Sequence, residues 1–163
     1  MLGLARTTAS PPSFILMGAD TSPHIGVLRP SDLLPLPQKA TKPGQITSST
    51  LHTSLCLGEM LLSSHPDRSS TQPLYTIKQD DNGKSLVYTD VGAGQETIRK
   101  VQQLDVQDNI LVILAHDASI KHVLKYWPES ANGWMNEGWK SECTWSFLKD
   151  YVGEDEQGQD SRL

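Results

Sequence analysis

Cysteine, long apolar runs and basic clusters are all scarce in this sequence. Two cysteines among 163 residues are too few for a disulfide framework or a four-cysteine zinc ribbon. No stretch reaches the roughly 18 consecutive apolar residues of a transmembrane helix, so no membrane-spanning segment is expected. Lysine and arginine total 14 against 19 acidic residues, and they form no basic run. We therefore expect neither a membrane nor a nucleic acid as partner.

The N-terminus lacks the basic segment and the long apolar segment of a secretory signal peptide. A cytoplasmic location is the default expectation. The length suits one domain, and a hydrophobic content of 37% predicts that part of the chain is loop or tail. We assign the domain to residues 1–152, including a long Pro- and Ser-rich loop at 21–50. Residues 153–163 are expected to form a disordered acidic tail.

Two apolar runs predict buried strands, and each ends at side chains that can bind a metal. Ile110 to Ala115 is unbroken, which suits a strand covered on both faces, and His116 and Asp117 follow it. A shorter run at residues 13–17 leads through Gly18-Ala19 to Asp20. We expect residues 2–8 to form a hairpin with this second run, turned at Ser10-Pro-Pro12.

Apolar spacing predicts the remaining elements. An amphipathic helix is expected to start after Gly92-Ala-Gly94 and to run to about Leu104, which gives helix, buried strand and helix in α/β layers. Leucines in the first half of the long loop suggest that this half packs against the body. Further expected elements are a helix face at Ile120, Val123 and Leu124, a hairpin of 75–78 with 85–88 around Asn82-Gly83, a short helix at 51–62, and a Trp-rich helix or helix pair from Trp134 to Leu148.

Asp20 and His116 make the sharpest candidate site. A carboxylate and an imidazole at the carboxyl ends of neighbouring strands would point into one crevice, where α/β folds often place their chemistry. Zinc binds such N and O ligands, and a catalytic zinc takes at least three from the protein. From the residues alone, the commoner roles are a turn residue for Asp20 and a helix cap for His116-Asp117.

Other motifs favour structural roles. Cys143 is expected to be a buried apolar residue rather than a nucleophile. The tryptophans at 127, 134, 139 and 145 are expected to pack against the sheet rather than to line a ligand pocket. Gly92-Ala-Gly94 is typical of a helix-start turn rather than a phosphate-binding loop.

Several segments, spread over nearly the whole chain, resemble motifs of the metallo-β-lactamase-fold hydrolases. Phe14 to Asp20, with His24, resembles the fourth metal motif, and Asp105 to Asp117 resembles the fifth. One branch of the family also carries an Arg-Pro-Ser and Leu-Pro-Leu-Pro loop and a C-terminal helix, which this chain matches at Arg29-Pro-Ser31, Leu34-Pro-Leu-Pro37, Gly138-Trp139 and Trp145 to Asp150. The resemblance implies an α/β (α+β layered) fold, the C-terminal half of an αββα sandwich.

The resemblance also implies a site. Asp20 would be the carboxylate that bridges two zinc ions, and His116 the last histidine on the second ion. His24 and Asp117 would lie beside the metal or on the substrate side. The implied reaction is attack of a metal-bound hydroxide on an ester, lactone, lactam or thioester of a small-molecule substrate.

The main signature of that family, His-x-His-x-Asp-His, is absent from this sequence. Pro23 also stands where the branch often has the first of two histidines. The resemblance therefore implies a C-terminal half that lacks catalytic competence alone. Two alternatives stay open. One is a non-catalytic remnant or interaction domain, self-associating through the sheet face that a missing half would cover. The other is a single-metal site completed by another chain.

Overall fold

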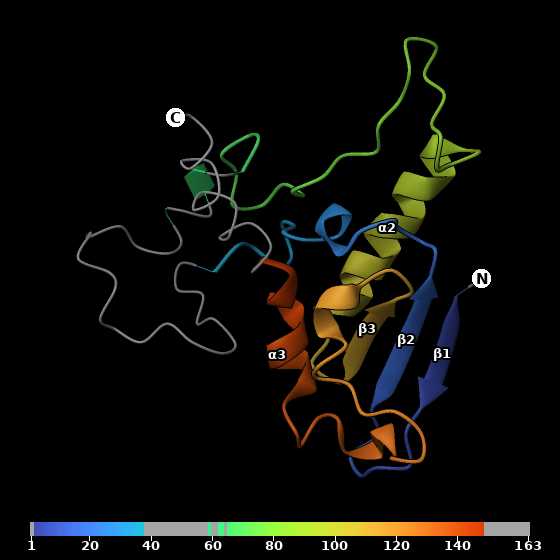
Figure 1. Cartoon of the computed structure of the whole chain (residues 1–163), viewed down its shortest axis with the longest axis vertical. Coiled ribbons are helices and arrows are strands. Elements are labelled where there is room, and N and C mark those ends of the chain that lie inside the picture. Colours follow the sequence, from blue (N-terminus) through green and yellow to red (C-terminus); the bar gives the residue numbers. More distant parts are fainter. Residues whose placement is uncertain (1, 38–58, 60–61, 64, 149–163) are drawn as a thin grey trace, which may run out of the picture.

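The centre of the molecule is a three-stranded sheet in the order β1-β2-β3. The computed structural model describes residues 2–37, 59, 62–63 and 65–148 (Figure 1). β1 (Gly3–Arg6) pairs antiparallel with β2 (Phe14–Ala19), and β2 pairs parallel with β3 (Ile110–Leu114). The predicted hairpin and the predicted buried strand are both confirmed. The chain is mixed α/β, as the alternation of helix and strand predicted.

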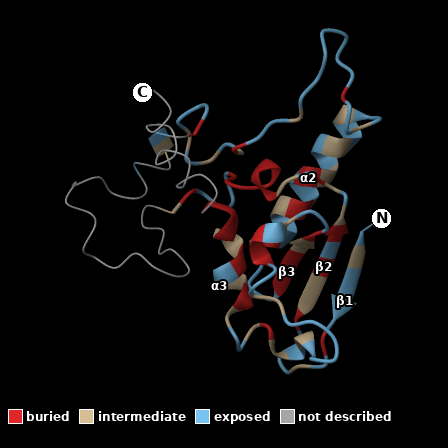
Figure 2. Cartoon of the chain, in the orientation of Figure 1, coloured by how far each residue is buried: buried red, intermediate tan, exposed pale blue. Residues whose placement is uncertain are grey.

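β3 is covered on both faces, which explains its unbroken apolar run (Figure 2). Its alternating side chains enter two separate clusters. The first contains Ile110, Val112 and Leu114 with Leu16, Ile98, Val101 and Phe147. The second contains Leu111 and Ile113 with Ile15, Ile120, Trp134, Trp139 and Cys143. β1 differs, because none of its four residues is buried.

The predicted amphipathic helix is confirmed as α2 (Val91–Asp105), which packs on β3 through Ile98 and Val101. It begins before Gly94 rather than after it, because the side chain of Asp90 accepts a hydrogen bond from the Ala93 N–H and caps the first turn. The Trp-rich segment forms η3 (Ala131–Gly133), α3 (Trp139–Thr144) and η4 (Ser146–Leu148).

Two expected elements are wrong. After β3 the chain forms only the short 3-10 turn η2 (Ala118–Ile120), capped by Asp117 and followed by hydrogen-bonded turns, and Pro128 has no backbone donor with which to extend a helix. The 75–78 and 85–88 segments form no strands. The predicted turn is present, with Gly83 at φ +76 and its N–H bonded to Asp80 O, but an isolated hairpin with exposed arms is marginal in water.

The first half of the predicted long loop packs, as expected. It contains η1 (Ile25–Val27), all of whose residues are buried. Residues 70–75 run beside it, with backbone bonds from Leu36 N to Ser70 O and from Tyr75 N to Gly26 O. The second half of that loop from residue 38, most of the predicted 51–62 helix and the predicted 153–163 tail lie outside the described residues.

The tryptophan prediction holds for some positions and fails at one. Trp134 and Trp139 are buried in the second cluster, and Trp145 packs against the first. Trp127 is 92% exposed, so the prediction that it packs against the sheet is wrong. Within the described part of the chain, no helix has the length and apolar character needed to cross a bilayer.

Candidate functional site at the carboxyl ends of β2 and β3

The two parallel strands bring Asp20 and His116 together. Ala19 pairs with Leu114 at the end of the ladder, and the Ala115 N–H extends it by bonding to Ala19 O at 3.1 Å. Asp20 follows at once, and its Oδ1 lies 2.8 Å from His116 Nε2. The side chains are 80% and 63% exposed, respectively. The convergence that the sequence predicted is therefore present, on an open surface.

A local irregularity in β2 aims Asp20. The register shifts between Met17 and Ala19, so Gly18 is the extra residue of a bulge. A Cβ at Gly18 would lie 2.4 Å from Leu114 Cδ2, and Ala19 adopts the left-handed φ of +44, which few non-glycine residues do. The strand therefore ends in a strained corner that redirects the chain just before the carboxylate.

Asp117 caps η2. Its Oδ1 accepts hydrogen bonds from the Ser119 N–H at 3.1 Å and from Ser119 Oγ at 2.5 Å. Ser119 Oγ also lies 2.7 Å from Ser146 Oγ, and both serines are buried. The capping alternative for this residue is thus the geometry observed, and it ties the His116-Asp117 corner to the start of η4.

His24 caps η1. Its Nδ1 accepts the Gly26 N–H at 2.9 Å, so the other ring nitrogen carries the proton when the ring is neutral. The ring meets Tyr75 edge-on, with centroids 4.8 Å apart, and Phe147 at 6.0 Å. This histidine therefore has a structural position among aromatic side chains, close in sequence to Asp20.

Comparison with known proteins finds homologues that cover nearly the whole chain. No family model matches the chain, and no solved structure matches it. The metallo-hydrolase mfmC of Annulohypoxylon moriforme is 38% identical over 153 residues, covering 93% of this chain and 37% of its own length. The γ-lactamase FDB1 of Fusarium pseudograminearum is 36% identical over 158 residues, covering 96% and 36%. The γ-lactamase MBL2 of Gibberella moniliformis is 43% identical over 75 residues, covering 46% and 30%.

These homologues are named metallo-hydrolase and γ-lactamase, in agreement with the resemblance of the chain's motifs to the metallo-β-lactamase-fold hydrolases. The chain spans only about a third of the length of the curated relatives that it matches. The name metallo-hydrolase implies that this relative uses a metal ion. Asp20 and His116 offer the right kinds of donor atom for such an ion.

The described residues do not complete a metal centre. Among them, no group of three or more His, Cys, Asp or Glu side chains is placed to hold an ion. A catalytic zinc takes at least three protein ligands, and the Asp20–His116 pair supplies two. Cys143 adds none, because burial raises the pKa of its thiol to about 12 and keeps it protonated.

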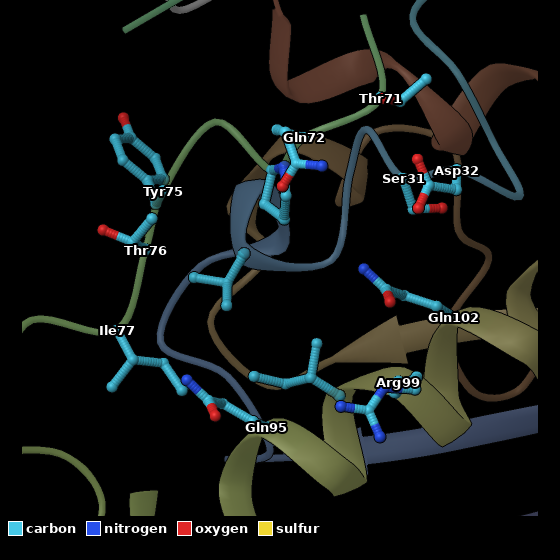
Figure 3. A pocket seen from close by; sticks show the side chains of 13 residues that line it. Ser31, Asp32, Thr71, Gln72, Tyr75, Thr76, Ile77, Gln95, Arg99 and Gln102 are labelled. Carbon is cyan, nitrogen blue, oxygen red and sulfur yellow. The ribbon is translucent and has the colours of Figure 1, made fainter. Parts of the chain in front are cut away.

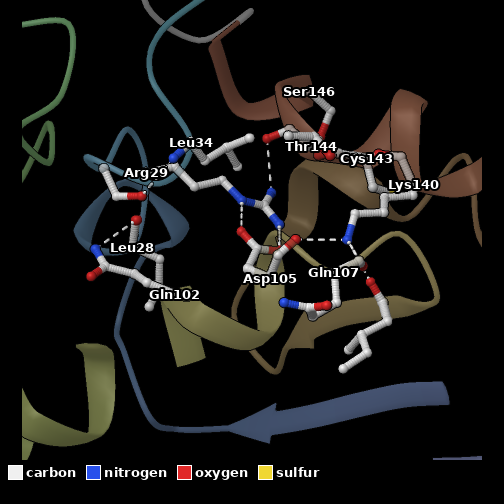
Figure 4. A network of polar contacts seen from close by, with 12 residues as sticks. Leu28, Arg29, Leu34, Gln102, Asp105, Gln107, Lys140, Cys143, Thr144 and Ser146 are labelled. Carbon is white, nitrogen blue, oxygen red and sulfur yellow. Dashed lines mark hydrogen bonds and ion pairs between the residues drawn. The ribbon is translucent and has the colours of Figure 1, made fainter. Parts of the chain in front are cut away.

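A buried ion pair lies at the end of α2, beside the start of β3 rather than at the Asp20–His116 end of the sheet, and sequence reasoning missed it (Figure 4). Arg29 donates from Nε and Nη2 to the two carboxylate oxygens of Asp105, each at 2.6 Å, and both side chains are only 3% exposed. Arg29 Nη1 also donates to Thr144 O. The guanidinium therefore joins the loop after β2, the end of α2 and the end of α3.

Lys140 closes the same network from α3. Its ammonium donates to the carbonyl oxygens of Asp105 and Gln107 at 2.6 Å and of Ile110 at 2.7 Å (Figure 4). Burial lowers the pKa of Lys140, and the three carbonyls at the end of α2 and the start of β3 satisfy its protons. In the sequence, Arg29 belongs to the Arg-Pro-Ser motif and Asp105 begins the segment that resembles the fifth motif. Neither motif indicates that the two side chains pair.

Two hollows flank the segment at residues 75–77. One, of about 360 Å³, lies against α2 and has a polar rim that includes Asp32, Gln95, Arg99 and Gln102 (Figure 3). The other, of about 390 Å³, lies on the side of Pro23, His24 and Tyr88. Val27 lines both hollows, and the second is also lined by Pro23 and His24, which lie closest to Asp20 in the sequence.

Proposed function

We propose that this chain supplies the C-terminal metal-binding portion of a metallo-hydrolase and is not competent for hydrolysis alone. The observation that carries this proposal is the 2.8 Å approach of Asp20 Oδ1 and His116 Nε2 at the ends of two parallel strands. Both side chains are exposed, so an ion and further ligands have access to them. In this proposal, the missing ligands are supplied from outside this chain.

The proposed metal is zinc, one or two ions in the complete site, because a carboxylate and an imidazole are typical zinc ligands. The proposed reaction is hydrolysis of an ester, lactone, lactam or thioester in a small molecule. Two of the relatives are named γ-lactamases and one is named a metallo-hydrolase, which supports this reaction class. The roles of Asp20 as a bridging ligand and of His116 on the second ion belong to this proposal.

Zinc binding by the purified chain tests the proposal. We expect less than one zinc per chain by mass spectrometry, and weak binding in zinc titrations, because two protein ligands rarely hold a catalytic ion. Asp20→Ala and His116→Ala each reduce the affinity by about tenfold or more, whereas His122→Ala, at an exposed histidine, does not. Binding that survives in both site variants would place the ligands elsewhere. Tight stoichiometric binding that both variants abolish would contradict the claim of incompetence.

An interaction domain is the second candidate, and the open edge of β1 favours it. Because β3 is covered on both faces, association through an exposed sheet face would involve β1 and β2. Exposed apolar side chains of the sheet are Leu4 in β1, 57% exposed, and Met17 in β2, 49% exposed, and Leu2 just before β1 is 45% exposed. Gly3–Arg6 carries no lysine or proline to block edge pairing. We propose that a second copy of the chain pairs here, as an antiparallel strand.

Replacing Leu4 with lysine tests this association. We expect the wild-type chain to show a concentration-dependent increase in mass by light scattering, and Leu4→Lys to stay monomeric, because an edge lysine opposes strand pairing. Leu33→Lys is the matched control, since Leu33 is 53% exposed but lies in the loop after η1. A wild-type chain that is monomeric at all concentrations would exclude the second candidate.

A further inference from the structure

The hollow of about 390 Å³ is a pocket built from four separate parts of the chain, one of which contributes Pro66 alone. Pro23, His24 and Val27 line it from the loop after β2, and segments at 74–78 and 85–88 form the opposite sides. Its volume lies in the range of small-molecule sites in proteins. Apolar and aromatic side chains predominate, and Lys78 is the one Asp, Glu, Lys or Arg residue among the described lining residues.

Two tyrosines form fixed walls, because each ring lies directly on the backbone of a glycine. A Cβ at Gly94 would lie 2.6 Å from Cδ1 of Tyr88, and a Cβ at Gly26 would lie 2.9 Å from Cδ2 of Tyr75. Any other residue at either glycine would displace the ring. The positions of both walls are therefore determined by α2 and η1, which are elements of the fold.

Tyr88 also connects the pocket to the candidate site. Its hydroxyl donates to Thr21 O at 2.8 Å, and Thr21 directly follows Asp20. Burial raises the pKa of Tyr88, so the hydroxyl remains a donor at neutral pH. His24, four residues after Asp20, packs edge-on against Tyr75 at the other wall. The pocket and the carboxylate thus share one short loop.

We propose that this pocket binds the uncharged, ring-sized apolar part of the small molecule whose hydrolysable bond lies at Asp20 and His116. A flat ring gains contact with aromatic walls in offset or edge-to-face geometry, and a nearly neutral lining disfavours a charged group. The identity of this molecule as a substrate rests on the proposed function. The pocket itself rests on the tyrosine–glycine contacts.

Indole binding tests the pocket without requiring hydrolysis. We expect saturable binding in NMR titrations, with backbone shifts concentrated at residues 74–78 and 85–88. Val87→Asp weakens binding by about tenfold or more, because it places a carboxylate in the apolar lining. Leu86→Asp is the matched control, since the neighbouring Leu86 is fully exposed and is not among the lining residues. Gly94→Ala also weakens binding, because it displaces the Tyr88 ring.

The outcomes separate this inference from the proposed function. No saturable binding, or equal binding by the Val87→Asp and Leu86→Asp chains, overturns the pocket whatever the zinc result. Indole binding that Val87→Asp selectively removes supports the pocket. If zinc binding is at the same time unaffected by Asp20→Ala and His116→Ala, the proposed function fails and the pocket stands.

Discussion

Replacing Arg29 by alanine is expected to lower the free energy of unfolding by about 3–5 kcal/mol. The reason is that Asp105, 3% exposed, would keep its carboxylate in the interior without the two charge-assisted hydrogen bonds that now satisfy it. The Thr144 carbonyl would lose its donor as well. Urea denaturation followed by tryptophan fluorescence measures the change.

Three variants make the Arg29 measurement specific. Arg99→Ala removes the exposed pair with Glu96 on α2 and is expected to cost about 0.5 kcal/mol or less. Arg29→Lys keeps the charge but loses the planar bidentate contact with the carboxylate. Its loss of unfolding free energy is therefore expected to lie between those of Arg29→Ala and Arg99→Ala. The double replacement Arg29→Met with Asp105→Leu is expected to recover much of the stability, because it leaves no unpaired charge. Equal losses in Arg29→Ala and Arg99→Ala would refute the central role of the ion pair.

Replacing Trp134 by alanine is the second large loss, expected at about 3–5 kcal/mol. Trp134 is 1% exposed and packs with Leu111, Ile120, Trp139 and Cys143, so its removal leaves a cavity on one face of β3. Its indole nitrogen has no hydrogen-bond partner among the described residues, so the loss comes from volume and contact rather than from a broken polar bond. Thermal unfolding by circular dichroism and denaturant titration both report it.

The controls for Trp134 use the same residue type. Trp127→Ala is expected to change the free energy of unfolding by no more than about 0.5 kcal/mol, because this ring is 92% exposed. Trp134→Phe keeps an aromatic ring and removes the unbonded donor, so its loss is expected to be smaller, about 1–2 kcal/mol. A loss at Trp127 as large as at Trp134 would contradict the packing described for the second cluster.

The sheet and the Asp20–His116 pair could be predicted because their signals are local. An unbroken apolar run marks a strand that is covered on both faces, and β3 is such a strand. Parallel strands present their carboxyl ends at one edge, so polar residues after two apolar runs are expected to meet there. The Asp90 cap and the spacing of Ile98 and Val101 are likewise local signals of α2.

The rest depends on contacts between distant segments. Arg29 and Asp105 are 76 positions apart. Charged residues of these types usually lie on the surface, so the sequence does not indicate that the fold buries this pair. The need for glycine at 26 and 94 arises from tyrosine rings that arrive from other segments. The segment after β3 forms η2 and turns rather than a longer helix, and the apolar spacing of Ile120, Val123 and Leu124 does not distinguish the two.

Lys140 has a consequence for how the molecule opens. Its ammonium is the donor for carbonyl oxygens of Asp105, Gln107 and Ile110, so α3 satisfies backbone groups that belong to α2, the following turn and β3. Detachment of α3 would strip these carbonyls of that donor and expose the second cluster in the same event. The C-terminal elements and the sheet are therefore expected to unfold as one cooperative unit, and hydrogen exchange in α3 should be as slow as in β3.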